Sequence, residues 1–250
     1  MTQKEQDKQE MAEIRDIVNK YGWFVGFFDA DTATPSFGYT IGLWEKYKHP
    51  EIITFGLPVE VIQEILNAAA AKVKEGHPLV LDQDDYDILE ELPVRFRTVY
   101  ADNVEDYMGY AQRYYNGKSF PAVQLFWTDG AQHYPWDKAC DEAIAFSQPL
   151  LDQKLDFKFF EPRHVATFTS RQIVKDKQPV LYVYHDEEDG AWQFLPGTAV
   201  AEEDIMMVSL EEMVQLDPTL NELFNLPMGE IAVRRFAGDK WERMEAGEEE

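Results

Sequence analysis

Residues able to carry catalytic or metal chemistry are few in this sequence and lie far apart. The chain has five histidines, at His49, His77, His133, His164 and His185. No two of them have the i, i+4 spacing that places two metal ligands on one helix face. The sequence also lacks the glycine-rich phosphate loop, the dinucleotide-binding turn, the nucleophile elbow and the zinc-protease helix. We therefore predict no metal site, no bound cofactor and no recognisable catalytic centre.

Two single residues still deserve comparison with a catalytic role. His49 precedes Pro50 and Glu51, just ahead of an apolar strand, and a histidine titrates near the pH at which a general base works. A loop histidine hydrogen-bonded near a strand end is the simpler interpretation, because no partner residue is identifiable. Cys140 needs a neighbouring base to become a nucleophile, whereas Asp141 and Glu142 disfavour the thiolate. We interpret Cys140 as a small packing residue.

Acidic clusters occur twice in the chain. The first comprises Asp82, Asp84, Asp85 and Asp87, which resemble half of a calcium-binding loop. A calcium loop needs glycine at its sixth position and a carboxylate at its twelfth, where this chain has Asp87 and Pro93. The second is the run from Asp186 to Asp189. Both runs are typical of solvated acidic surfaces, and we expect the second to form a hairpin turn.

Composition and charge exclude several classes of partner. The 250 residues include 23 Lys and Arg against 47 Asp and Glu, a net charge of −24. Such a surface repels the phosphates of nucleic acids and of anionic membranes. No apolar run approaches the length of a membrane span, the charged N-terminus has no apolar signal segment, and one cysteine cannot form an internal disulfide. We expect a soluble cytoplasmic protein.

The elements of the N-terminal part alternate irregularly between helix and strand, which predicts an α+β unit with a mixed, barrel-like sheet. Helices are expected over residues 4–20, from Pro58 to Gly76 and from 102 or 103 to 115, with a short helix starting at residues 135–137. Strands are expected over 22–28, 37–43, 52–55, 94–100 and 120–127, and a short helix or loop over 82–91.

A second, smaller α+β unit with antiparallel hairpins is expected from residue 159. Strands 178–185 and 192–195 flank the acidic turn, and strands 231–236 and 241–244 flank a second turn. Ser209 and Glu212 form a capping box that starts a helix over 210–216. The predicted domains are 1–158 and 159–244, followed by an acidic tail at 245–250. Because no flexible linker separates them, we expect the two units to pack together.

Several short motifs of the first unit occur in a fixed order. They are Tyr21-Gly22-Trp23, Phe37-Gly38-Tyr39-Thr40-Ile41-Gly42-Leu43, His49-Pro50-Glu51, Phe55-Gly56-Leu57-Pro58, Gln124-Leu125 and Tyr134-Pro135-Trp136. In this set the chain resembles the bacterial domain-of-unknown-function family 4262 over roughly residues 10–155. That family has no established activity, so the resemblance implies a domain boundary and no mechanism.

The second unit resembles a different family. The motifs are Thr169-Ser170-Arg171, residues 179–184, residues 190–194, Val208-Ser209-Leu210 and Asp217-Pro218-Thr219-Leu220. They are similar to the immunity-protein-33-like family, also called domain-of-unknown-function family 2185. Members of that family are thought to neutralise bacterial toxins by binding, and the resemblance implies such a role for this unit.

These observations lead to two competing hypotheses of function. The first is a non-enzymatic acidic protein that binds a basic partner such as a toxin, with Asp186, Glu187, Glu188, Asp189 and Trp192 as the contact residues. The second is a small-molecule or flavin-type enzyme, with a pocket made by Tyr39, Thr40, His49, Gln124 and Trp136. In a variant of the first, the N-terminal unit is a scaffold and the C-terminal unit recognises the partner. The sequence leaves the oligomeric state open.

Overall fold

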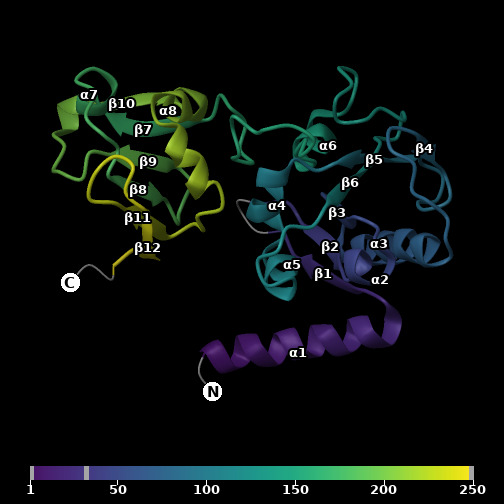
Figure 1. The fold of residues 1–250 in the computed structure, drawn as a ribbon. Helices are drawn as coiled ribbons and strands as arrows, with labels where there is room; N and C mark the ends of the chain where they lie inside the picture. Colours follow the sequence, from purple (N-terminus) through teal and green to yellow (C-terminus); the bar gives the residue numbers. More distant parts are fainter. Residues whose placement is uncertain (1–2, 31–33, 248–250) are drawn as a thin grey trace. The chain divides into compact units, whose positions relative to one another are not determined.

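The computed structural model describes residues 3–30 and 34–247, which form two separate units (Figure 1). The N-terminal unit comprises residues 3–30 and 35–155, and the C-terminal unit comprises residues 156–247 together with Thr34. Each unit is built on one six-stranded sheet with helices packed against it. The α+β class predicted for both units is therefore confirmed.

The sheet of the N-terminal unit has the strand order β1-β2-β3-β6-β5-β4. Its strands are β1 (Phe24–Phe28), β2 (Phe37–Ile41), β3 (Glu51–Phe55), β4 (Asp84–Asp85), β5 (Val94–Thr98) and β6 (Ala122–Trp127). Only β3 and β6 pair in parallel; the other neighbouring strands are antiparallel. The sheet is open rather than barrel-like, because β1 and β4 form its two edges within the described residues.

Helices cover both faces of this sheet. They are α1 (Gln3–Tyr21), α2 (Leu43–Tyr47), α3 (Val59–Lys74), α4 (Ala101–Tyr107), α5 (Gly109–Tyr114) and α6 (Glu142–Ser147). On one face, Ile62 and Leu66 of α3 pack with Phe96 and Leu125 in a cluster of buried apolar side chains. The other face carries aromatic rings and meets α4, where the ring of Tyr107 lies edge-on to that of Phe55 at 5.4 Å.

Four elements of this unit differ from their sequence predictions, and one of them is α2, which was not predicted. The acidic stretch 82–91 contributes the short strand β4, because Arg95 of β5 binds Asp84 directly at 2.7 Å. The helix expected up to residue 115 is split into α4 and α5 by Met108, whose φ of −116° and ψ of 44° are not helical. The helix expected at residue 135 begins only at Glu142, where the Asp141 carboxylate accepts hydrogen bonds from the first backbone N–H groups.

The C-terminal unit arranges its strands in the order β10-β7-β9-β8-β11-β12. They are β7 (Ala166–Ser170), β8 (Tyr182–His185), β9 (Trp192–Leu195), β10 (Ile205–Ser209), β11 (Glu230–Val233) and β12 (Glu242–Glu245). Its helical segments are α7 (Arg171–Val174), α8 (Leu210–Leu216) and the 3₁₀ turns η1 (Glu202–Asp204) and η2 (Pro218–Leu223). Both predicted hairpins and the capping box are confirmed, whereas β10 was not predicted.

A substitution at Gly38 tests how closely α3 packs on the first sheet. A Cβ atom at this position of β2 would lie 2.6 Å from Cγ2 of Ile62 and 2.9 Å from the backbone oxygen of Gly26. Because of this overpacking, the free energy of unfolding of the Gly38→Ala variant should be about 1–3 kcal/mol lower than that of the parent protein. Urea denaturation measures the difference. Gly109→Ala is the matched control, because nothing lies within 4 Å of its added Cβ. Equal effects of the two substitutions would contradict this packing.

Candidate functional site

The carboxylate of Glu51 is the most enclosed charged group of the N-terminal unit. Its side chain is fully buried, and four donors surround it. Oε1 accepts from the backbone N–H groups of Gly42 (2.9 Å) and Trp44 (3.0 Å) and from the hydroxyl of Tyr115. Oε2 accepts from the hydroxyl of Thr40 at 2.7 Å. The carboxylate therefore joins β2, α2, β3 and the end of α5.

The local sequence explains how these donors converge. Gly42 adopts a φ of 111°, which favours glycine, and this turns the chain from β2 directly into α2. No side chain of α2 caps its own first turn, so the backbone N–H groups there need an outside acceptor. Glu51, at the start of β3, supplies that acceptor at the positive end of the helix dipole. The two sequence motifs Thr40–Leu43 and 49–51 thus meet in one structural joint.

The electrostatics of this joint favour a structural role for Glu51. Burial raises the pKa of its carboxyl group, while the hydrogen bonds from Thr40, Tyr115 and the two backbone N–H groups oppose that rise. Burial also raises the pKa of the Tyr115 hydroxyl, and the adjacent carboxylate raises it further. Because both oxygens already accept hydrogen bonds, Glu51 is poorly placed to take a proton from a substrate.

The structure does not bring the five predicted pocket residues together. Tyr39, Ile53, Gln124 and Arg97 are successive partners across four strands, so their side chains share the aromatic face. Thr40 follows Tyr39 along β2 and therefore points to the opposite face. His49 is partly buried in the turn after α2, where its Nδ1 lies 2.7 Å from the carbonyl oxygen of Pro50 and burial lowers its pKa.

The remaining pocket residues have protein partners of their own. The Tyr39 hydroxyl accepts from the backbone N–H of Tyr110 at 3.2 Å. Gln124 donates to the carbonyl of Pro149 at 2.8 Å and accepts from the N–H of Leu151 at 3.1 Å. These contacts fasten α5 and the segment after α6 to the aromatic face of the sheet.

Trp136 belongs to a stack of rings and guanidinium groups that the sequence did not reveal. Its ring lies 4.8 Å from that of Tyr134 at an interplanar angle of 8°, and the guanidinium of Arg97 lies 3.4 Å from its centre. Arg95 covers Tyr134 at 4.4 Å, and Asp84 accepts from the Tyr134 hydroxyl at 2.8 Å. The alternation of Arg95 and Arg97 with apolar residues was visible in the sequence, but not the aromatic partners about 40 residues away.

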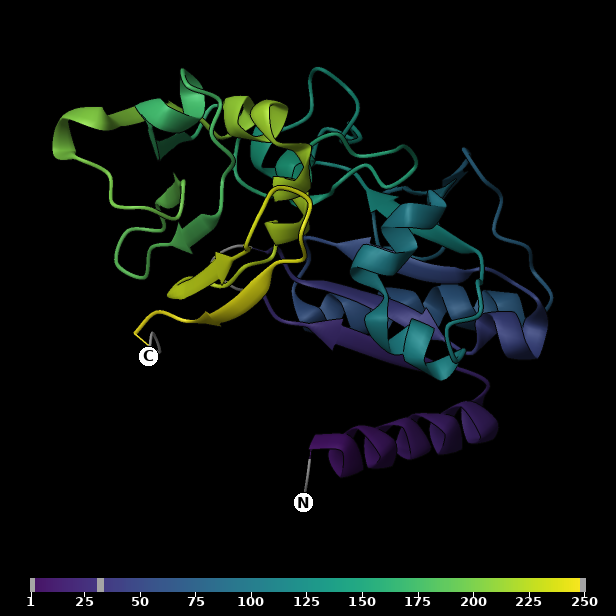
Figure 2. The ribbon, with the colours of Figure 1, turned by 60° about the vertical axis from the view of Figure 1, so that its left-hand side comes forward.

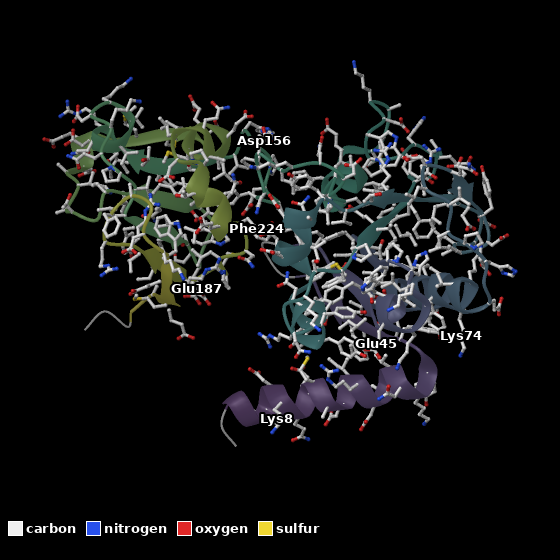
Figure 3. All side chains as sticks on the ribbon, viewed as in Figure 1. Lys8, Glu45, Lys74, Asp156, Glu187 and Phe224 are labelled. Atoms are coloured by element: carbon white, nitrogen blue, oxygen red, sulfur yellow. The ribbon has the colours of Figure 1, made fainter. Side chains whose placement is uncertain are left out.

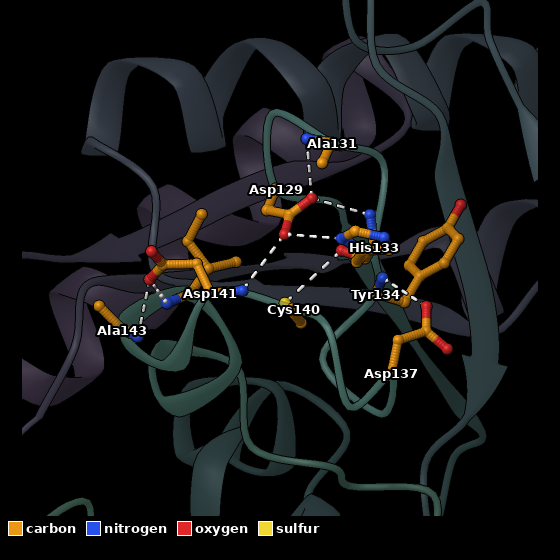
Figure 4. A network of polar contacts seen from close by, with 9 residues as sticks. Asp129, Ala131, His133, Tyr134, Asp137, Cys140, Asp141 and Ala143 are labelled. Atoms are coloured by element: carbon orange, nitrogen blue, oxygen red, sulfur yellow. Dashed lines mark hydrogen bonds and ion pairs between the residues drawn. The ribbon is translucent and has the colours of Figure 1, made fainter.

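Asp129 organises the loop that follows β6 (Figure 4). Its Oδ1 accepts from the backbone N–H groups of Ala131 (2.9 Å) and His133 (2.8 Å), and its Oδ2 accepts from the N–H of Asp141 (3.2 Å). The His133 ring also contacts Oδ2, through Nδ1 at 3.2 Å. These hydrogen bonds lower the pKa of Asp129. Cys140 donates from Sγ to the His133 carbonyl at 3.6 Å, so the loop does not align a thiol with a histidine ring.

The acidic turn of the C-terminal unit is exposed, whereas its predicted aromatic partner is not. Asp186 accepts from the N–H of Glu188 at 2.8 Å and Asp189 from that of Ala191 at 2.9 Å, so these two carboxylates build the turn. Glu187 and Glu188 are exposed, and Glu187 is marked in Figure 3.

Trp192 was predicted to contact a partner, but the structure places it in the interior. It is fully buried, and its ring stacks on that of His185 at 4.0 Å. Its Nε1 donates to Glu161 at 2.7 Å. The alternation of β9 turns this side chain toward the core, so Trp192 supports the hairpin instead of reaching a partner.

Three exposed apolar side chains of the C-terminal unit lie together on β10 and the strand beside it. Met207 is 66% exposed, Ile205 is 50% exposed, and Phe168, opposite Met207 in the register, is 38% exposed. We call these three residues the β10 patch. A hollow of about 450 Å³ adjoins it, lined by Phe168 and Ile205 together with Gln193 and Leu195 of β9. The patch was missed because β10 is a short run directly after three acidic residues, without strand periodicity.

The described residues thus define an α+β protein with two open six-stranded sheets. Residues 17–141 match the family described as a domain of unknown function, DUF4262. The match spans half of the chain, and the protein belongs to this family. Glu51, Thr40 and Asp129 all lie within the matched residues.

Other comparisons add no second family. No curated protein matches the chain. No solved structure matches it either. The C-terminal unit lies outside the matched residues, so its resemblance to the immunity-protein-33-like family stays a prediction. Within residues 3–30 and 34–247, no group of His, Cys, Asp and Glu is arranged to hold a metal ion, and no helix is long and apolar enough to cross a membrane.

Removing the Glu51 carboxylate should destabilise the N-terminal unit strongly. In Glu51→Ala, two backbone N–H groups and the hydroxyls of Thr40 and Tyr115 lose their acceptor in a buried site, which should cost about 3–4 kcal/mol in unfolding free energy. Glu51→Gln keeps an acceptor oxygen and should cost only about 1–2 kcal/mol. Urea denaturation followed by tryptophan fluorescence measures both. Equal losses in the two variants would show that the hydrogen bonds do not hold the joint.

The Asp129 loop makes a separate prediction for hydrogen exchange. In Asp129→Ala, the amides of Ala131, His133 and Asp141 should exchange faster with deuterium, because each loses its acceptor. Asp137→Ala is the control in the same loop, since Asp137 accepts from the N–H of Tyr134 alone at 2.8 Å. Faster exchange of all four amides in both variants would mean that the loop unfolds as a whole and that Asp129 has no special part in it.

Proposed function

We propose that this protein is a non-enzymatic bacterial binding protein of the cytoplasm, which captures a basic partner protein through the β10 patch. A toxin neutralised by direct binding is the partner class that the resemblance of the C-terminal unit favours. The observation that carries the proposal is the exposure of Ile205 and Met207 on an edge strand beside a hollow. Adjoining exposed apolar side chains rimmed by polar groups are typical of interaction surfaces.

The charge around the β10 patch supports a basic partner. Glu202 and Glu203 precede the strand and are both exposed. Residues 159–250 contain 8 Lys and Arg against 20 Asp and Glu. A field of this sign accelerates encounter with a positively charged protein, and apolar contact at the patch then slows dissociation. Glu187 and Glu188 of the β8–β9 turn add to the field without needing to touch the partner.

The competing enzyme hypothesis has less support. It needs Tyr39, Gln124 and Trp136 to present free polar groups or ring faces to a ligand. The Tyr39 hydroxyl and the Gln124 amide are already bonded to backbone groups, and Arg97 covers the Trp136 ring. A binding role, with the N-terminal unit as scaffold or as a second contact surface, requires no rearrangement of these residues.

The proposal predicts that a charge introduced into the β10 patch weakens binding. The probe is the basic product of a toxin gene adjacent to this gene, titrated by calorimetry against the full chain and tested by co-expression for protection of cells. Met207→Glu should weaken binding at least about tenfold, since it places a charge in an apolar contact. Phe236→Glu is the matched control, because Phe236 is 58% exposed in the other hairpin of the same unit.

Three outcomes would overturn the proposal. They are no complex and no protection with the parent chain, equal binding by Met207→Glu and the parent, or equally tight binding of hen lysozyme. The last would show attraction by charge alone, since lysozyme is a basic protein with no relation to the chain.

A further inference from the structure

A groove runs along the free edge of the first sheet, between α1 and β1. We call it the α1–β1 groove. It contains a hollow of about 300 Å³, lined by Glu13, Ile14 and Ile17 of α1, by residues 24–28 and by Tyr110. Figures 1 and 2 both show α1 lying lengthwise beside β1. A second hollow of about 710 Å³ continues the groove toward the start of α1 and shares Glu10, Glu13 and Tyr110 with the first.

One wall of the groove is an edge strand. β1 pairs with β2 from Phe24↔Ile41 to Phe28↔Phe37, and no described residue pairs with its other side. The outward N–H and C=O groups of such a strand can pair with an added chain. Gly26 lines the hollow at mid-strand, where an added Cβ would meet only the rings of Phe24 at 3.5 Å and Tyr39 at 4.0 Å. A side chain of an added segment therefore has room above the face of the strand at its centre.

The opposite wall is held in place and is acidic. Val18 of α1 is fully buried against Gly42, and Arg15 donates to the carbonyl of Tyr114 at 2.8 Å. These contacts hold α1 in place beside β1 as a wall. Glu10 and Glu13 line the groove there. Arg113 is the basic residue of the second lining and pairs with Asp7 at 3.9 Å, whereas the exposed Lys8, which Figure 3 shows on α1, belongs to neither lining.

We propose that the α1–β1 groove binds an extended basic segment of a partner protein, which adds to β1 as a further strand. Strand addition between an edge strand and a helix satisfies the free backbone groups of both chains. Five residues of β1 span about 16 Å, which matches five residues of an added strand. Alternate side chains of the segment then enter the apolar hollow, and lysine or arginine side chains face Glu10 and Glu13. This site is separate from the β10 patch, so either can fail alone.

A designed peptide tests the proposal without knowledge of the natural partner. The probe is a ten-residue peptide of alternating lysine and valine with blocked ends, whose binding to the full chain is measured by fluorescence anisotropy. Amide resonances of residues 24–28 and of α1 should shift in a ¹⁵N spectrum. A peptide of alternating glutamate and valine should not bind. A lysine–valine peptide N-methylated at every second residue should bind at least about tenfold more weakly, because it cannot complete the strand pairing.

Protein variants locate the site. Glu13→Lys reverses a charge in the groove and should weaken peptide binding about tenfold or more. Asp16→Lys makes the same charge change at an exposed position of α1 outside the lining, and it should change the affinity less than about twofold. Gly26→Val should fill the hollow and abolish binding, with circular dichroism as the check of folding. Equal effects of Glu13→Lys and Asp16→Lys, or resonance shifts confined to residues 205–209, would overturn the proposal. Binding of benzylamine at Glu13 without binding of the peptide would overturn it as well.

Discussion

The N-terminal unit depends on one buried carboxylate. Taking the charge of Glu51 out of water costs several kcal/mol, and the cost is offset only because four donors converge on its two oxygens. Those donors come from β2, from the first turn of α2 and from the residue after α5, so the carboxylate fixes how three segments meet. Thr40 extends the joint, since its hydroxyl also accepts from the N–H of Ile52 in β3 at 2.9 Å.

The two sheets share two features of their topology. Each has a single parallel pair inside an otherwise antiparallel arrangement, β3 with β6 in the first and β7 with β9 in the second. Each also ends in an edge strand, β1 or β10, that no described strand covers. The backbone groups of an uncovered edge can pair with another chain, and acidic side chains lie near both edges.

Local patterns predicted most of the elements, because the forces that form them act within a few residues. The apolar stripe of α3, the capping box of Ser209 and Glu212 and both hairpins of the second unit are confirmed. Predictions failed where a distant partner decided the outcome. Arg95 of β5 binds Asp84, which lies in β4. The strand β10 has no periodic signal of its own and exists because β7 pairs with it.

Residue types and short-range spacing by themselves determined the α+β class, the acidic surface and the exposed turn around Glu187. These follow from composition and from the periodicity of neighbouring residues, which any stretch of chain carries with it. Tertiary structure alone decided that Trp192 is buried and that Glu51 finds Tyr115, 64 residues away. Contacts of that kind depend on which strands become neighbours. The free energy of burying apolar side chains in the complete core decides that arrangement, and no short stretch of chain contains it.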